Sequence, residues 1–166
     1  MAKDGSFDIT TGCDLQEVAN AVNQARKEIS TRFDFKNVTA EIDYEHGQTK
    51  IGLHAADDYK LEAMWQVLSG RMIARNVPIK NMVRETPQKA AQGTIRQDVN
   101  LVQGIEQDIA KKIVRFVKDQ KYKKAQAQVQ GDAVRVSAPS RDELQLVMKD
   151  LKAQDYGIEL KFGNYR

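Results

Sequence analysis

The chain has 166 residues, of which 41% are hydrophobic and 30% charged, a balance that excludes a disordered chain and fits a globular protein. Its apolar runs are far too short to cross a bilayer, and its first segment, MAKDGSFDITTG, has no apolar signal region. We therefore expect a cytoplasmic protein with no membrane partner. The single cysteine, Cys13, excludes an internal disulfide and a thiolate metal site within one chain.

The net charge of +3 is too small to indicate a partner, but the charge is unevenly distributed. Residues 111–124 contain seven basic side chains and one acid, so this stretch is strongly positive and the rest of the chain is slightly negative. Such asymmetry is a hint of an anionic partner.

The same pattern of elements occurs twice. Residues 18–43 align with residues 105–130, and residues 51–68 align with residues 134–151, with a longer turn in the first copy. Few residues are identical, but the apolar positions and the turn agree. A repeat of this kind predicts two small domains of one fold.

Apolar spacing, capping residues and turn residues predict the elements of the first copy. They are a strand over 7–10, a helix over 15–29 capped by Asp14, strands over 38–42 and 51–53, a helix capped by Asp57 or Asp58, an edge strand over 77–79, and an inter-repeat linker over 86–93.

The second copy repeats this order. Its predicted elements are a strand over 95–101, a helix with apolar residues from Val102 to Phe116, strands over 125–129 and 134–136 joined at Gly131-Asp132, a helix opened by a capping box of Ser140 and Glu143, and a strand over 158–162. Each copy reads β-α-β-β-α-β. We therefore predict an α+β protein of two ferredoxin-like domains, each an antiparallel sheet with two helices on one face.

The basic stretch and the strands after it form the main candidate site. Lys111, Arg115 and Lys118 fall on one side of the predicted helix, opposite its apolar stripe. Gln126 and Gln128 share one face of the next strand, and Arg135 should lie on the matching face. Cations of this kind attract phosphates, and amides can hydrogen-bond bases. The charge of this stretch alone favours an ordinary helix face exposed to solvent. The polar side chains of the neighbouring strands are what favour a binding site for a nucleotide or another anion.

Other classes of site find little support. The outward positions of the central strands carry no aromatic residue, so base stacking as in RNA-recognition motifs is not indicated. There is no glycine-rich phosphate loop, no nucleophile beside a base, and no metal-ligand spacing around His46 or His54. We therefore predict a protein without catalytic activity or cofactor.

The string Arg32-Phe33-Asp34-Phe35-Lys36 has two interpretations. Its aromatic and basic side chains could clamp a purine ring, with Arg32 and Lys36 as a weaker group of phosphate contacts. Alternatively, Phe33 and Phe35 fill the corner between helix and strand, since Phe35 aligns with Tyr122 at the same corner of the second copy.

An ordered set of short strings resembles the YajQ family of bacterial proteins from end to end. The strings are Ser6-Phe7-Asp8-Ile9, Asp14-Leu15-Gln16-Glu17-Val18, Arg32-Phe33-Asp34-Phe35-Lys36, Gln103-Gly104-Ile105, Lys111-Lys112-Ile113-Val114, Gln126-Ala127-Gln128-Val129-Gln130-Gly131-Asp132, Arg135-Val136, Arg141-Asp142-Glu143-Leu144-Gln145 and Asn164-Tyr165-Arg166.

The resemblance implies two ferredoxin-like domains that exchange their first strands. One would comprise residues 13–101, completed by the strand over 94–101, and the other residues 1–12 plus 102–166. It also implies nucleotide binding, with nucleoside triphosphates, RNA and cyclic di-GMP as proposed ligands and no established enzymatic activity. Where family members usually have Gly-Lys, this chain has Ala138-Pro139-Ser140, so one cation is missing. The usual Gln-Phe-Lys-Asn-like string also reads Lys161-Phe162-Gly163-Asn164.

The sequence thus predicts a non-catalytic nucleotide-binding protein that acts as a cytosolic effector or regulator. The candidate nucleotide-binding residues are Lys111, Arg115, Lys118, Lys121, Lys123, Lys124, Gln126, Gln128, Arg135, Arg141, Arg32 and Lys36. The alternative is an adaptor that uses the same basic surface to bind a protein of the transcription or translation machinery.

Overall fold

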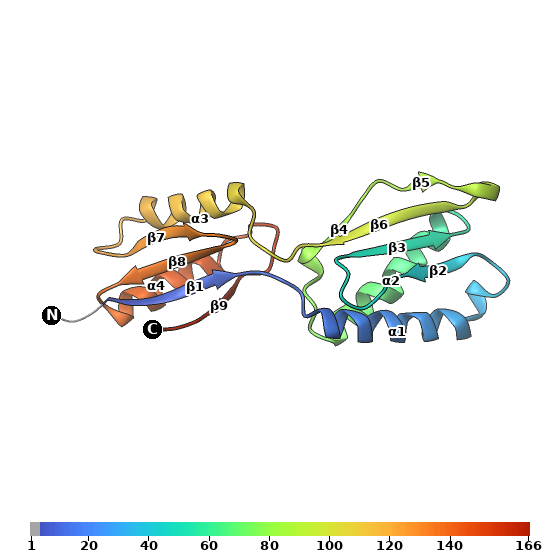
Figure 1. The fold of residues 1–166 in the computed structure, drawn as a ribbon, viewed down its shortest axis with the longest axis horizontal. Helices are drawn as coiled ribbons and strands as arrows, with labels where there is room; N and C mark the ends of the chain where they lie inside the picture. Colours follow the sequence, from blue (N-terminus) through green and yellow to red (C-terminus); the bar gives the residue numbers. More distant parts are fainter. Residues whose placement is uncertain (1–3) are drawn as a thin grey trace. The chain divides into compact units, whose positions relative to one another are not determined.

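The computed structural model describes residues 4–166, so the first three residues of the expected segment 1–12 lie outside it. The chain forms two compact units, shown in Figure 1. Unit 1 comprises the described residues up to Thr11 together with Gln103–Arg166, and unit 2 comprises Gly12–Val102. Every helix within residues 4–166 is too short or too polar to span a membrane.

Unit 1 is an antiparallel sheet with two helices packed on one face. Its elements are β1 (Gly5–Thr10), α3 (Gln107–Asp119), β7 (Gln126–Gln130), β8 (Ala133–Ala138), α4 (Arg141–Lys152) and β9 (Lys161–Gly163). The strand order is β7-β8-β1-β9. Apolar residues alternate with polar ones along β1 and β8, so that Phe7, Ile9, Val134 and Val136 are buried under the helices.

Unit 2 has a larger sheet and two longer helices. Its elements are α1 (Leu15–Thr31), η1 (Phe33–Phe35), β2 (Ala40–Asp43), β3 (Lys50–Ala55), α2 (Asp58–Ala74), η2 (Ile79–Asn81), β4 (Met82–Arg84), β5 (Gln88–Lys89), η3 (Ala91–Gly93) and β6 (Ile95–Leu101). The strand order is β2-β3-β6-β4, and β5 also pairs with β6. The core lies between this sheet and the two helices, and contains Val22, Leu53, Met64 and Val99.

The pairing of β1 and β6 connects distant parts of the sequence. β1 pairs with β8 and β9, which follow it by more than a hundred residues, and Phe7 lies opposite Val136. β6 immediately precedes the second copy in sequence, yet it pairs with β3 and β4 of the first copy. Figure 1 shows β1 beside β8, and β6 between β3 and β4. Each sheet is therefore completed by a strand that neighbours the other copy in sequence.

The predicted α+β class, with antiparallel sheets and four α-helices in the described part of the chain, is confirmed. The caps also agree with the sequence. The side chain of Asp14 accepts hydrogen bonds from the N–H groups of Gln16 and Glu17, and Asp57 accepts one from Lys60. A side-chain acceptor at this position satisfies donors that have no partner inside the helix.

Three predicted segments are wrong. Residues 77–79 do not form an edge strand, because Pro78 starts the 3₁₀ turn η2 and the strand begins only at Met82. The expected linker 86–93 instead contains β5, which pairs with β6 across a turn in which Gln92 adopts φ of 60°. The second-copy helix begins at Gln107, so Val102 and Ile105 precede it.

Candidate functional site

A groove runs between α3 and β7, which is the strand at one edge of the unit 1 sheet. We call it the α3–β7 groove, and its volume is about 630 Å³. It is lined by Lys111, Val114, Arg115, Lys118, Asp119, Ala127, Gln128 and Val129. Three of the predicted cations thus share one concave surface with Gln128, a residue of the neighbouring strand that was also predicted.

Helix geometry explains why these cations lie together. Positions 111, 115 and 118 fall on one stripe of a helix, because residues three and four apart are neighbours on its surface. The buried face of α3 consists of Ala110, Ile113 and Val117, and Val114 stands at its border. The cationic stripe therefore borders β7 at the margin of the buried face, whereas the sequence placed it on the opposite side of the helix.

The cations of the groove are largely free to meet a ligand. Among the described residues, neither Lys111 nor Lys118 has a hydrogen bond or ion pair to its ammonium group. Arg115 is 3.8 Å from Asp119, but its side chain is 84% exposed, and an exposed pair of this length contributes little. Three cations and one carboxylate, Asp119, are among the residues that line the groove, which therefore has a net positive charge.

β7 is the edge strand of its sheet, and this adds hydrogen-bonding groups to the groove. Within the described part of the chain β7 pairs only with β8, so its outer side presents unpaired backbone N–H and C=O groups. The half-buried side chains of Ala127 and Val129, together with Val114, give the groove an apolar floor. Cations, backbone polar groups and an apolar floor therefore meet in one place.

The loop after α3 carries the next three predicted cations, and α4 holds its backbone in place. The carboxylate of Glu143 accepts hydrogen bonds from the N–H groups of Lys124, at 2.8 Å, and Ala125, at 3.1 Å. The hydroxyl of Tyr122 donates to Asp150 at 2.5 Å. Burial and this hydrogen bond raise the pKa of Tyr122. The side chains of Lys121, Lys123 and Lys124 are exposed and extend the positive surface beyond the helix.

The predicted capping box is only half formed. Ser140 accepts a hydrogen bond from the N–H of Glu143 at 3.4 Å, as expected for a helix cap. The Glu143 side chain, however, turns to the loop before β7 and away from the backbone of Ser140. It fixes the position at which β7 begins beside the α3–β7 groove.

The open face of the unit 1 sheet carries less positive charge than the sequence suggests. Nε of Arg135 is 2.9 Å from Oδ1 of Asp8, its register partner on β1, and Asn164 donates to the other oxygen of Asp8 at 2.5 Å. The hydrogen bonds from Arg135 and Asn164 lower the pKa of the Asp8 carboxyl from its ordinary value of 3.8. Asp8 thus neutralises Arg135, which leaves the amides of Gln126 and Gln128 as the exposed predicted groups of this face.

This ion pair predicts a pH-dependent contribution to stability. Because the folded-state pKa of Asp8 is lowered, its stabilisation is present above about pH 4 and is lost as the pH falls through the folded-state pKa. We expect Asp8→Asn to unfold at lower urea concentration than the wild type at neutral pH, and the difference to shrink at about pH 3. Asp43→Asn, which alters an exposed strand carboxylate of unit 2, is the control. A difference that persists unchanged in acid would contradict the assignment.

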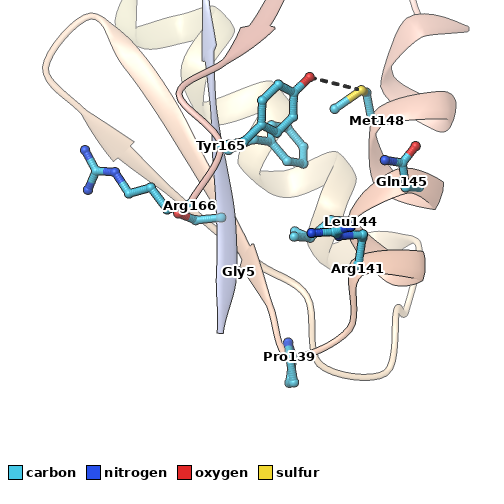
Figure 2. A pocket seen from close by; sticks show the side chains of 10 residues that line it. Gly5, Pro139, Arg141, Leu144, Gln145, Met148, Tyr165 and Arg166 are labelled. Atoms are coloured by element: carbon cyan, nitrogen blue, oxygen red, sulfur yellow. Dashed lines mark hydrogen bonds between the residues drawn. The ribbon is translucent and has the colours of Figure 1, made fainter. Parts of the chain in front are cut away.

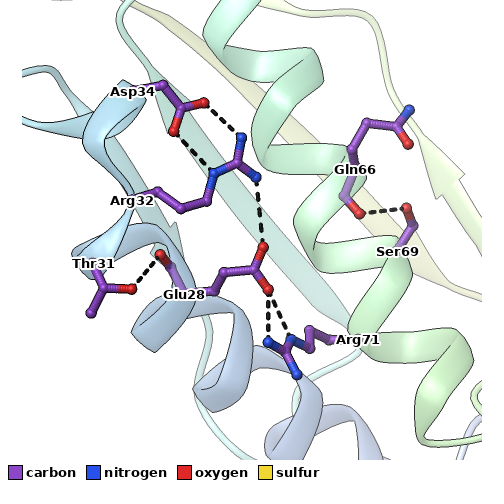
Figure 3. A network of polar contacts seen from close by, with 7 residues as sticks. All are labelled: Glu28, Thr31, Arg32, Asp34, Gln66, Ser69 and Arg71. Atoms are coloured by element: carbon purple, nitrogen blue, oxygen red, sulfur yellow. Dashed lines mark hydrogen bonds and ion pairs between the residues drawn. The ribbon is translucent and has the colours of Figure 1, made fainter.

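Arg32 is already held by acidic groups. Its guanidinium binds both oxygens of Asp34, at 3.0 and 2.6 Å, and lies 5.0 Å from the centre of the Phe35 ring. Figure 3 shows Glu28 between Arg32 and Arg71, which it contacts at 3.6 and 2.8 Å. This network ties α1, η1 and α2 together, so Arg32 has little charge to offer a ligand.

The two phenylalanines of that string behave differently. Phe35 is buried and fills the corner between helix and strand, whereas Phe33 is 87% exposed. The corner interpretation therefore holds for Phe35 alone. Lys36 is exposed next to them. Both Arg32 and Lys36 belong to unit 2, whereas the residues of the α3–β7 groove belong to unit 1.

Arg141 lines a different pocket of unit 1, beside α4, shown in Figure 2. Within unit 1, Arg141 therefore does not line the α3–β7 groove. No cluster of three or more His, Cys, Asp or Glu residues suited to a metal ion occurs in residues 4–166. The sequence reasoning missed Asp8, which neutralises Arg135, and Val114, which contributes to the groove floor.

Comparison with known proteins places this α+β chain in a family. The family described as "Nucleotide-binding protein YajQ-like" matches residues 5–166. The chain is 50% identical to a nucleotide-binding protein of Koribacter versatilis over 163 residues, 98% of each chain. It is 49% identical to one of Desulforamulus reducens over 166 residues, covering 100% of this chain and 99% of the relative. The chain therefore belongs to the YajQ-like family.

Proposed function

We propose that this protein is a non-catalytic nucleotide-binding protein whose α3–β7 groove holds the phosphates of its ligand. The observation that carries the proposal is the presence of two unpartnered lysines and an exposed arginine in one groove beside an open strand edge. Its relatives in Koribacter versatilis and Desulforamulus reducens are named as nucleotide-binding proteins, which supports the same ligand class here.

The groove offers a distinct contact for each part of a nucleotide. Lys111, Arg115 and Lys118 span about 10 Å along the helix axis, enough for more than one phosphate group. A base can lie on the apolar floor, where the free backbone groups of β7 can hydrogen-bond its edge. Cyclic di-GMP, a nucleoside triphosphate and RNA all share this combination of phosphate and base.

The groove supports binding without catalysis. Asp119 is the one acidic residue among those that line it, and it is paired with Arg115. No histidine, no cysteine and no second carboxylate is among the residues that line the groove. We therefore assign the protein the role of a cytosolic effector or regulator that senses its ligand.

The architecture of this binding protein is part of the proposal. We infer two ferredoxin-like domains, residues 13–101 and residues 1–12 plus 102–166, that exchange their first strands. The pairing of β1 with β8 and β9, and of β6 with β3 and β4, supports the exchange. In this arrangement α3 and β7 of the second domain carry the ligand groove.

Adjacent lysines of α3 give a closely matched test. Lys111 lines the groove, whereas Lys112 is exposed on the same helix and does not. Labelled cyclic di-GMP, GTP and a short RNA should be titrated at low and moderate salt. For the ligand that binds, we expect Lys111→Gln to lower affinity about fivefold and Lys112→Gln to change it less than about twofold. The proposal would be contradicted if none of the three ligands bound at a concentration of about 10⁻⁵ M. It would also be contradicted if the two variants lost affinity equally.

A second candidate function follows from the open edge of β7. An extended acidic segment of a transcription or translation protein could add to this strand, with its carboxylates toward the α3 cations. The protein would then be an adaptor. Binding of a synthetic acidic peptide that is blocked by a proline in place of Ala127, whose N–H points away from β8, with no binding of any nucleotide, would favour this alternative.

A further inference from the structure

Unit 1 contains a second pocket, of about 600 Å³, that the proposed nucleotide groove does not use. It lies between α4, the beginning of β1 and the segment that follows β9, as Figure 2 shows. Its lining includes Gly5, Arg141, Leu144, Gln145, Met148 and Tyr165. None of these residues lines the α3–β7 groove.

The spacing along α4 and a close backbone approach build this pocket. Residues 141, 144, 145 and 148 follow the three- and four-residue spacing that places side chains on one face of a helix. On the other side, Ser6 and Arg166 exchange backbone hydrogen bonds of 3.2 and 3.0 Å. A Cβ atom on Gly5 would be 3.1 Å from Cδ1 of Leu144, so glycine keeps this end of the pocket open.

The interior is apolar and aromatic. Leu144 and Met148 contribute its aliphatic surface, and Tyr165, which is 63% exposed, stands over it. The hydroxyl of Tyr165 contacts the sulfur of Met148 at 3.9 Å, and its ring lies 6.4 Å from that of Phe7. An aromatic side chain held in this way can stack on a flat ring.

Two arginines, Arg141 and Arg166, line this pocket, and Figure 2 shows the Arg166 side chain directed away from α4. Figure 2 shows the Arg141 side chain reaching along the pocket beside Leu144. Within residues 4–166 its guanidinium has no hydrogen bond or ion pair. An arginine without a partner that lines the same pocket as an aromatic ring and an apolar surface is suited to a ligand that combines a flat ring with an anionic group.

We propose that this pocket binds a planar aromatic anion, with its ring between Tyr165 and the Leu144–Met148 surface and its anionic group on Arg141. The site is independent of the nucleotide groove. The ligand chemistry is that of an aromatic carboxylate or of a nucleoside monophosphate, both of which combine a flat ring with a negative charge. A pocket of this size accommodates a molecule of either kind.

Two fluorescent probes that differ in charge test the proposal on the full chain. Anilinonaphthalene sulfonate is a planar aromatic anion, and N-phenylnaphthylamine is its uncharged counterpart. We expect Arg141→Gln to weaken sulfonate binding roughly fivefold and to leave binding of the uncharged probe unchanged. Tyr165→Leu should weaken both probes. Lys149→Gln, an exposed lysine of α4 outside the pocket, is the matched control and should change neither.

Competition then separates the two ligand sources. Displacement of the sulfonate probe by indole-3-acetate assigns the pocket to aromatic carboxylates, and displacement by AMP assigns it to nucleoside monophosphates. Failure of both competitors would overturn the proposal. So would sulfonate binding that responds to Lys118→Gln, a groove residue, and not to Arg141→Gln. An unfolded variant would lose the uncharged probe as well, which distinguishes misfolding from loss of the anion contact.

Discussion

Replacing Phe7 with alanine should strongly destabilise unit 1 and leave the stability of unit 2 unchanged. Phe7 is 0% exposed, lies opposite Val136 on β8, and makes an edge-on ring contact with Phe162 at 5.9 Å. Truncation of a buried phenylalanine costs about 3–5 kcal/mol, a large part of the total stability of a small domain, about 5–15 kcal/mol. Because β1 belongs to the sheet of unit 1, we expect the loss to be confined to that unit.

Hydrogen exchange followed by mass spectrometry can locate the loss. In Phe7→Ala, peptides of β7, β8 and α4 should lose protection, while those of α1, β3 and α2 keep theirs. Phe33→Ala is the control, since Phe33 is 87% exposed and the substitution is chemically identical. It should change the unfolding free energy by less than about 0.5 kcal/mol. Protection lost first in unit 2 would show that β1 does not stabilise the sheet assigned to it.

Reversing two charges in the α3–β7 groove should abolish tight nucleotide binding. In Lys111→Glu/Lys118→Glu, two free cations become anions on the surface proposed to receive phosphates. We expect a loss of roughly hundredfold in affinity at low salt, because attraction becomes repulsion at two positions. For an RNA ligand, the slope of log affinity against log salt should also decrease by about two.

The control for this double variant has the same net charge. Lys112→Glu/Lys149→Glu changes two exposed lysines of unit 1 that do not line the groove. It should retain affinity within about threefold at moderate salt, because salt weakens the attraction of exposed charges that do not contact the ligand. Equal losses in both variants would indicate a general electrostatic attraction and would remove the groove assignment.

Local features of the fold were predictable from the sequence. The caps at Asp14 and Asp57 depend on a side chain and the next few backbone N–H groups, and alternation along β3 and β8 depends on one face being buried. The predicted strand over 77–79 was wrong because two apolar residues on either side of Pro78 are compatible with a 3₁₀ turn as well as with an edge strand. The strand β5 was missed because Gln88 and Lys89 are both exposed and carry no apolar pattern.

In the candidate site, too, features set by residues close in sequence were predictable, whereas contacts between residues far apart in sequence were not. Helical spacing was enough to group Lys111, Arg115 and Lys118. It could not reveal that Asp8 neutralises Arg135, because the two residues are 127 positions apart and meet only when β1 pairs with β8. The sequence held one signal for this contact. Asp8 alternates with the apolar residues Phe7 and Ile9 on a short strand, which places its carboxylate on the open face of the sheet.

The pairing of β1 with β8 and β9 has a consequence for biosynthesis. A ribosome makes β1 before the contiguous stretch Gly12–Val102, and it makes β8 and β9, the strands that pair with β1, only after that stretch. The nascent chain therefore carries the uncovered side chains of Phe7 and Ile9 through most of its elongation, while unit 2 can already fold behind them. We expect chains that stall before β8 to aggregate or to recruit a chaperone through this segment.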